Sequence, residues 1–145
     1  MNDYRHILAA VDLSPESEQV IARAHDMAQH FQARLTFVHV VEPVVADPGY
    51  DMMPVIPVEI QDSLIQRAQQ YLGKLAGQLA PAEIDQHVAV GSVKGEIFRL
   101  IEEQSVDLVV LGTHGRHGVG LLLGSTANAL LHGTPCDVLA VRIED

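Results

Sequence analysis

The sequence contains one cysteine, no tryptophan and few basic residues. A single cysteine, Cys136, excludes an internal disulfide framework. The 9 Lys and Arg residues are outnumbered by 19 Asp and Glu residues, and the formal net charge is −10. Nucleic acids and anionic lipid surfaces attract proteins with a basic face, so we expect neither as a partner. No apolar run is long enough to span a membrane, and the first residues lack the apolar segment of a signal peptide, so we expect a cytoplasmic protein.

The sequence does contain enough apolar residues for one ordinary core. Of its 145 residues, 48% are hydrophobic, and the length is close to that of a common single domain. We therefore expect one domain over residues 1–145, with a core that needs neither disulfides nor metals.

Apolar runs typical of buried strands alternate with stretches of helical periodicity. We predict five strands: Ile7–Val11, Leu35–Val41, Gln86–Val90, Asp107–Leu111 and Asp137–Ile143. We predict four helices: one capped by Ser14 and running to Phe31, one over Ile60–Leu79, one over Glu96–Gln104 after a turn at Gly91–Gly95, and one over Ser125–His132 that stops at Gly133. Residues 42–57 indicate a loop that packs partly on the body. This alternation favours a doubly wound α/β fold, in which ligands bind at the carboxyl ends of parallel strands.

The strongest functional signal is the stretch G-T-H-G-R-H-G-V-G-L-L-L-G-S, which runs from Gly112 to Ser125. It follows a predicted strand and precedes a predicted helix, so backbone N–H groups can bind a phosphate there, and the hydroxyls of Ser125 and Thr126 add donors. Glycines that merely close a tight turn are the alternative. No lysine follows Gly95, so we expect this loop to hold phosphates rather than to transfer one.

Asp12, directly after the first predicted strand, is the second candidate. Its carboxylate could accept a hydrogen bond from a ribose hydroxyl or hold a phosphate-bound Mg²⁺ through water. It could instead cap the first helix from just upstream, because Asp is a common cap. The residues themselves leave both roles open.

The remaining candidates are weaker. His114 and His117, with Cys136, lack a fixed fourth ligand, so we predict no metal site. We expect Arg116 to be an exposed charge, although its guanidinium could pair with a polyphosphate. His39 is expected to be a core histidine, and Cys136 an inert thiol. No G-x-S-x-G sequence is present, and we predict no catalytic residue.

Several segments in a fixed order are characteristic of one family. The opening H-I-L-A-A-V-D-L-S-P-E-S, the segment L-T-F-V-H-V-V, the pair D-L-V-V-L-G-T-H-G-R-H-G and L-L-L-G-S-T-A-N-A-L-L, and the final C-D-V-L-A-V-R resemble the universal stress protein family. The resemblance covers essentially the whole chain. It is accompanied by a specific fold expectation, a single doubly wound α/β domain whose five-stranded parallel sheet has the order 3-2-1-4-5, with helices on both faces.

Some members of that family bind ATP through the signature G-x2-G-x9-G-[ST], and others lack it. Gly112 and Gly115 match its first pair, and Gly124 with Ser125 matches its last pair. Eight residues separate Gly115 from Gly124, one fewer than in the signature. The shorter loop either still wraps a triphosphate, helped by its extra glycines, or favours a smaller nucleotide.

By position, the resemblance implies a nucleotide site and a homodimer. Ala10, Val11 and Asp12 would line the adenine and ribose end, and Val40 would close the adenine pocket. The phosphates would be held by Gly112, Gly115, Gly124, Ser125 and Thr126. The implied ligand is ATP or AMP, and Mg²⁺ could accompany the phosphates. The family commonly dimerises through its last strand, edge to edge.

The hypothesis that follows is a small cytoplasmic nucleotide-binding stress protein. It would act as a nucleotide-dependent switch or a partner-binding dimer, with slow ATP hydrolysis at most. The alternative is a nucleotide-free dimeric interaction module of the same family. A true ATPase that uses Asp12 and Mg²⁺ is a third, weaker hypothesis.

Overall fold

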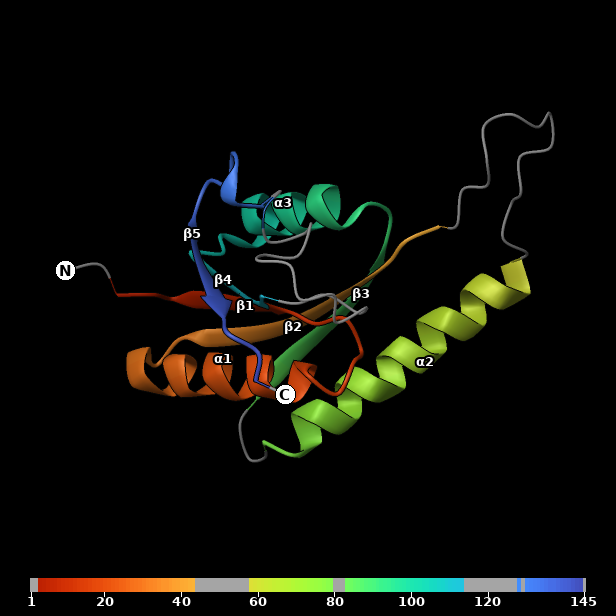
Figure 1. Cartoon of the computed structure of the whole chain (residues 1–145), viewed down its shortest axis with the longest axis horizontal. Coiled ribbons are helices and arrows are strands. Elements are labelled where there is room, and N and C mark those ends of the chain that lie inside the picture. The colour runs from red at the N-terminus through yellow and green to blue at the C-terminus, as the bar shows by residue number, and fades with distance from the viewer. Residues whose placement is uncertain (1–2, 44–57, 80–82, 114–127, 129, 145) are drawn as a thin grey trace.

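The computed structural model describes residues 3–43, 58–79, 83–113, 128 and 130–144. These residues build a five-stranded, all-parallel sheet with helices on both sides (Figure 1). The strands lie in the order β3-β2-β1-β4-β5, which confirms the predicted fold class and strand order.

The helices and strands follow the predicted alternation. The strands are β1 His6–Ala10, β2 Arg34–Val41, β3 Ile84–Val90, β4 Leu108–Gly112 and β5 Asp137–Val141. The helices are α1 Ser17–Phe31, α2 Val58–Gly77 and α3 Val93–Gln104, and residues 128, 130 and 131 are also helical. No helix in the described part of the chain is long and apolar enough to cross a membrane.

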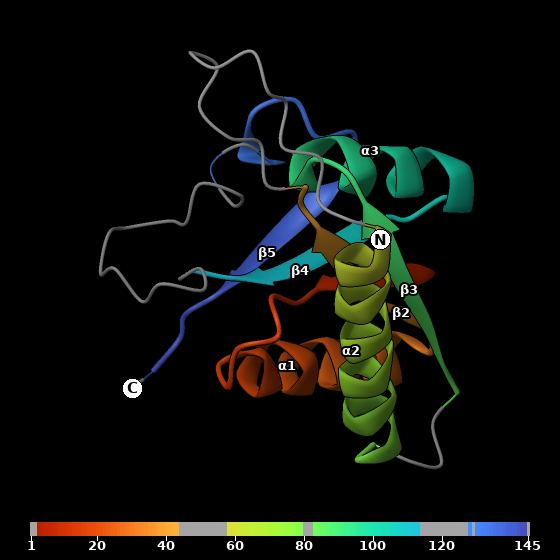
Figure 2. The same cartoon turned by 90° about the vertical axis from the view of Figure 1, so that its right-hand side faces the viewer.

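Helices cover both faces of the sheet, and each face has its own apolar core (Figures 1 and 2). On one face α1 and α2 cover a core whose largest fully buried members are Ile7, Phe37, Leu72 and Leu75. On the other face α3 and Leu130 cover a core whose fully buried members include Leu8, Val38, Val109 and Ile97. Successive residues of β1, β2 and β4 alternate between these cores, because strand side chains point to opposite faces. Burial on both sides explains the continuous apolar runs of the central strands.

The predicted start of the first helix was wrong. α1 begins at Ser17, after Glu16, and no side chain caps it. The Ser14 hydroxyl donates to the Asp12 carboxylate, while the Ser14 carbonyl accepts a hydrogen bond of 2.9 Å from the Ser17 N–H. Ser14 is thus part of a turn before the helix. Its hydroxyl donates to the charged Asp12 carboxylate, which is a strong acceptor, and does not cap an amide of the helix.

The predicted turn at Gly91–Gly95 was also wrong in part. Ser92 is the N-cap of α3, and its hydroxyl accepts a hydrogen bond of 3.1 Å from the Gly95 N–H. The helix therefore starts at Val93, three residues earlier than predicted. β3 likewise begins two residues earlier, at Ile84, where it pairs with Leu35.

β5 is shorter than predicted and ends at Val141 rather than at Ile143. Its last partner, Gly112, is the final residue of β4, so the ladder has nothing further to pair with. Beyond it, the Ile143 N–H donates to the Thr113 hydroxyl at 3.2 Å. Two other strands are shifted by one residue from their predicted bounds. β1 runs from His6 to Ala10, one residue earlier, and β4 runs from Leu108 to Gly112, one residue later.

Two predicted segments lie largely outside the described residues. They are the loop over residues 44–57 and the glycine-rich stretch over residues 114–127, which includes the start of the last predicted helix. The predicted stop of that helix is confirmed, since Gly133 has a φ of 100°, a conformation that favours glycine.

Candidate functional site

The described members of the predicted site lie at the carboxyl edge of the sheet, where β1 and β4 are neighbours. β1 pairs with β4 as far as Ala9↔Val110, so the carboxyl ends of these two strands lie next to each other. From this edge the chain winds from β1 toward β2 on one side, and from β4 toward β5 on the other. Such a reversal of winding is where open α/β sheets bind ligands. The strand order therefore brings Asp12 and Gly112, far apart in the sequence, to the same place.

The Asp12 carboxylate is held firmly through one of its two oxygens. Oδ1 accepts three hydrogen bonds, from the Ser14 N–H at 3.0 Å, from the Ser14 hydroxyl and from the Ser17 hydroxyl at 3.0 Å. Ser17 is buried, with 2% of its surface exposed. Among the described residues, none donates a hydrogen bond to Oδ2. The carboxylate is therefore fixed in orientation and retains one oxygen for a further donor.

These contacts contradict the alternative in which Asp12 caps α1. The first N–H groups of the helix, at Ser17, Glu18 and Gln19, donate to carbonyls of the preceding turn at 2.9, 3.2 and 3.0 Å. Asp12 contacts the helix only through the Ser17 hydroxyl. Its structural role is to fix the turn between β1 and α1, and its role in ligand binding stays a prediction.

The turn that carries Asp12 is strained at Leu13. Leu13 has a φ of 67°, in the left-handed region that residues with a side chain rarely adopt. Such a conformation costs on the order of 1–3 kcal/mol and persists only where surrounding contacts hold it. Strain of this kind gathers at binding sites, so it supports the assignment of this turn to the site.

Ala10 and Val40 belong to the apolar core on the α3 side of the sheet, whereas Val11 belongs to the core on the opposite side. Val11 and Val40 are buried and Ala10 is half-buried. Both backbone polar groups of Val11 are paired, its N–H with the Val38 carbonyl at 2.9 Å and its carbonyl with His39 Nδ1 at 2.9 Å. The backbone N–H and carbonyl of Val11 are therefore already paired within the protein. The last residue of β1, Ala10, pairs with Val38 of β2, and β2 continues to Val41. Val40 therefore lies beyond the end of β1.

Gly112 has a packing reason to be glycine. A Cβ at this position would lie 3.2 Å from side-chain carbons of Ile143 and of Val20. The next residue, Thr113, donates its N–H to the Val141 carbonyl at 2.9 Å. The end of β4 is thus packed tightly against α1 and the C-terminal segment, and the chain enters the glycine-rich stretch from a rigid position.

Two further residues fix the Asp12 turn and were not predicted in this role. The hydroxyl of Tyr71, on α2, donates a hydrogen bond of 3.1 Å to the Ser14 carbonyl. His39, predicted as a core histidine, is half-buried and bonds the Val11 carbonyl. Burial and the nearby carboxylates of Glu18, Asp12 and Glu16 raise the pKa of Tyr71. The only sequence signal for Tyr71 is its rarity, since the chain has three tyrosines.

Four residues assigned to the phosphates lie outside the described part of the chain, as do three of the weaker candidates. The former are Gly115, Gly124, Ser125 and Thr126, and the latter are His114, Arg116 and His117. Within the described residues, no group of three or more His, Cys, Asp or Glu side chains is arranged to hold a metal ion.

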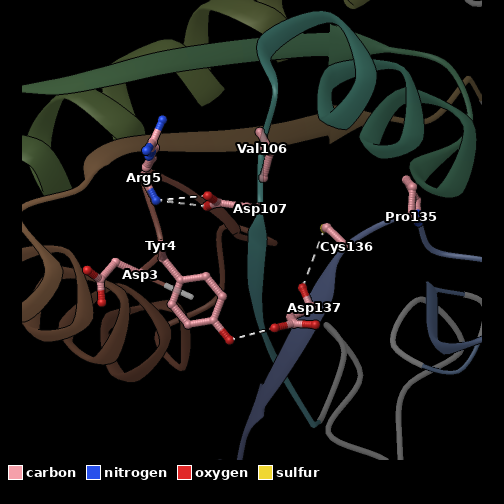
Figure 3. A pocket seen from close by; sticks show the side chains of 8 residues that line it. All are labelled: Asp3, Tyr4, Arg5, Val106, Asp107, Pro135, Cys136 and Asp137. Carbon is pink, nitrogen blue, oxygen red and sulfur yellow. Dashed lines mark hydrogen bonds between the residues drawn. The ribbon is translucent and has the colours of Figure 1, made fainter. Parts of the chain in front are cut away.

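A hollow of about 520 Å³ lies at the opposite, amino edge of the sheet (Figure 3). Its lining includes Tyr4, whose hydroxyl donates to Asp137 at 2.7 Å, and Asp107, whose carboxylate accepts the N–H of Arg5. Cys136 also lines it, and burial raises the pKa of this thiol, as expected for an unreactive cysteine. The polar groups here are largely paired with one another, and the hollow is remote from Asp12, so it is not the predicted site.

Comparisons with known proteins agree with this architecture. The profile of the Universal stress protein family matches residues 3–142. Universal stress protein A homolog 1 of Coxiella burnetii is 42% identical over 142 residues, which span 98% of this chain and 99% of the relative. The universal stress protein UspA of Lactobacillus plantarum superposes with a TM-score of 0.69 at 26% identity, over 98% of this chain and 100% of that one.

Two other solved structures were determined with nucleotides. One is a universal stress protein in complex with cAMP, with a TM-score of 0.65 and 22% identity over 97% of this chain and 98% of that one. The other is the universal stress protein of Archaeoglobus fulgidus in complex with dAMP, with a TM-score of 0.61 and 20% identity over 99% and 100% of the two chains. From the profile match and the close relative, this chain belongs to the universal stress protein family.

Proposed function

We propose that this protein binds an adenine nucleotide, ATP or AMP, at the carboxyl edge between β1 and β4, and acts in the cytoplasm as a nucleotide-dependent stress-response switch. The observation that carries this proposal is the state of Asp12. Its Oδ1 is saturated by Ser14 and Ser17, whereas its Oδ2 accepts no hydrogen bond from a described residue. A carboxylate held in this way accepts ribose hydroxyls without further ordering.

The neighbouring surfaces fit the rest of a nucleoside. The side chains of Ala10 and Val40, on one side of the sheet, would offer the apolar contact that a purine ring needs, and Val11 follows Ala10 directly in the chain. The structures of relatives with cAMP and dAMP support an adenine nucleotide as the ligand class.

The phosphate end of the proposal is based on the sequence beyond β4. Gly112 ends that strand at the switch point, and Gly115, Gly124, Ser125 and Thr126 would supply N–H and hydroxyl donors to phosphate oxygens. Mg²⁺ would neutralise phosphate charge and would be held mainly by phosphate and water oxygens, since Asp12 is one carboxylate with one oxygen to offer.

Calorimetric titration of the purified protein with ATP, ADP and AMP tests the proposal. We expect the variant Asp12→Asn to bind AMP about tenfold more weakly, because an amide NH2 would take the place of Oδ2 and cannot accept a hydrogen bond from a ribose hydroxyl. Asn retains the Oδ1 acceptor for Ser14 and Ser17, so the fold should persist. Asp26→Asn, at an exposed position on α1, is the matched control and should bind like the unchanged protein.

Two results would contradict the proposal. If none of the three nucleotides gives heat or a thermal shift at millimolar concentration, the site does not bind them. Equal affinities for Asp12→Asn and the unchanged protein would remove Asp12 from the site.

A second candidate function is a nucleotide-free dimeric interaction module; the shortened spacing between Gly115 and Gly124 favours it, and its dimer would form through β5. β5 is an edge strand whose Val138, Leu139 and Ala140 are only half-buried. The Val141 carbonyl points toward β4, where it accepts the Thr113 N–H. Because backbone groups alternate along a strand, the N–H and carbonyl of Ala140 point away from β4, toward the open edge. Two such edges could pair across a two-fold axis.

A further inference from the structure

We propose that Tyr71 is a positioning residue for the nucleotide site, which holds the turn between β1 and α1 so that Asp12 faces the ribose. This inference rests on the proposed function. It starts from one contact, the hydrogen bond of 3.1 Å from the Tyr71 hydroxyl to the Ser14 carbonyl. The contact joins α2, on one side of the sheet, to the turn that carries Asp12 (Figure 1).

Ser14 links Tyr71 to Asp12 directly. Its carbonyl accepts from Tyr71, and its N–H and hydroxyl both donate to Asp12 Oδ1. A shift of the Ser14 peptide therefore moves two of the three donors that orient the Asp12 carboxylate. The third donor, the buried Ser17 hydroxyl, belongs to α1.

The strain at Leu13 explains why this turn needs an outside support. Its left-handed backbone, with a φ of 67°, lies between two carbonyls that are held by side chains from other elements. His39 of β2 bonds the Val11 carbonyl on one side, and Tyr71 of α2 bonds the Ser14 carbonyl on the other. Without the second bond the Ser14 carbonyl keeps, among the described residues, only the Ser17 N–H as a partner, so the strained turn has less support against relaxation and Asp12 is held less firmly.

The surroundings of Tyr71 keep its hydroxyl protonated and able to donate. Tyr71 is partly buried and packs against the apolar core under α2, and the negative charges of Glu18, Asp12 and Glu16 act on its hydroxyl. Burial and these negative charges both disfavour a phenolate and raise the pKa of Tyr71. The hydroxyl is therefore a permanent donor near neutral pH.

The test compares two ligands that differ only at the ribose. AMP has both ribose hydroxyls, whereas 2′,3′-dideoxyadenosine monophosphate has neither. We expect Tyr71→Phe to weaken AMP binding about tenfold and to leave binding of the dideoxy analogue unchanged, because only AMP uses Asp12. A merely structural role of Tyr71 would weaken both ligands equally.

Tyr4→Phe is the matched control, since it removes a similar hydroxyl, bonded to Asp137 at 2.7 Å, from the opposite edge of the sheet. It should change neither affinity. Ser17→Ala, which removes a donor to Asp12 from α1, should reproduce the selective loss of AMP binding and replaces Tyr71→Phe if that variant does not fold.

The outcomes separate this inference from the proposed function. If the unchanged protein binds neither AMP nor ATP, the proposed function fails and this inference with it. If the unchanged protein binds AMP but Tyr71→Phe binds it equally well, or loses both ligands to the same extent, only the positioning role is overturned.

Discussion

Individual residues at the carboxyl edge are constrained by packing as well as by the proposed ligand. Gly112 matches the first glycine of the family signature, yet its missing side chain also makes room for Ile143 and Val20. A glycine in a binding motif can thus be required by the core beneath it. The two requirements are separable, because packing affects the free energy of unfolding and phosphate binding affects affinity.

Gly112→Ala should destabilise the fold by about 1–3 kcal/mol, because its Cβ would lie 3.2 Å from carbons of both Ile143 and Val20. Gly77→Ala is the matched control: nothing lies within 4 Å of that Cβ, and alanine favours the helix end, so a gain of up to about 1 kcal/mol is expected. Urea denaturation measures both free energies of unfolding. Equal stability of Gly112→Ala and the unchanged protein would contradict the packing argument.

The elements meet the site through their ends, and helix starts are the ends that sequence patterns describe least well. α1 starts without a side-chain cap after a turn built around Asp12, whereas α3 starts at an ordinary serine cap. The two serines differ in the hydrogen bond that their hydroxyls make. The Ser14 hydroxyl donates to the Asp12 carboxylate two residues away, whereas the Ser92 hydroxyl accepts from the Gly95 N–H and so caps the helix. The start of α3 is thus stabilised by a cap, whereas the start of α1 follows the turn of the candidate site.

Ser92→Ala should lower the free energy of unfolding by about 1 kcal/mol, because it leaves the Gly95 N–H without its cap. The same substitution at Ser63, exposed inside α2, should change stability by less than about 0.5 kcal/mol. Thermal or chemical unfolding of both variants measures this. Nucleotide affinity should not change in either, since neither serine is hydrogen-bonded to the Asp12 turn, and an affinity loss in Ser92→Ala would speak against this division of roles.

At the scale of the whole molecule, the sheet has two edges, and they differ in how the chain covers them. β3 lies at one edge and packs against α2, whereas β5 lies at the other with half-buried side chains and backbone groups directed outward. Beyond β5, the chain is fastened to α1 by a reciprocal pair of hydrogen bonds between Gln19 and Glu144, at 2.8 and 3.0 Å. The segment after the edge strand is thereby held in place, which suits strand-to-strand association.

Ala140→Pro should convert a dimer into a monomer of 15.8 kDa, because it removes an N–H that points to the open edge and none that pairs with β4. Ala140→Val is the control, since it keeps the N–H and suits a strand. Light scattering after gel filtration measures the mass of each. A monomeric unchanged protein, or a dimeric Ala140→Pro, would rule out dimerisation through β5.

The sequence by itself determined the fold class, the order of the elements and their approximate bounds. These properties follow from local information, the spacing of apolar residues and the turn residues between them, and the family segments pointed to the same strand order. It also pointed to Asp12 and Gly112 as site residues, because both follow strands whose carboxyl ends meet.

Only the tertiary structure showed how those residues are held. Ser17 showed that Asp12 fixes the turn and does not cap α1, Tyr71 and His39 showed what supports that turn, and Thr113 showed where β5 ends. Each of these contacts joins groups whose approach is set by how whole elements pack, and most of the partners are far apart along the chain. A local pattern carries no record of such neighbours, because a hydrogen bond depends on distance and direction in space and not on separation in sequence.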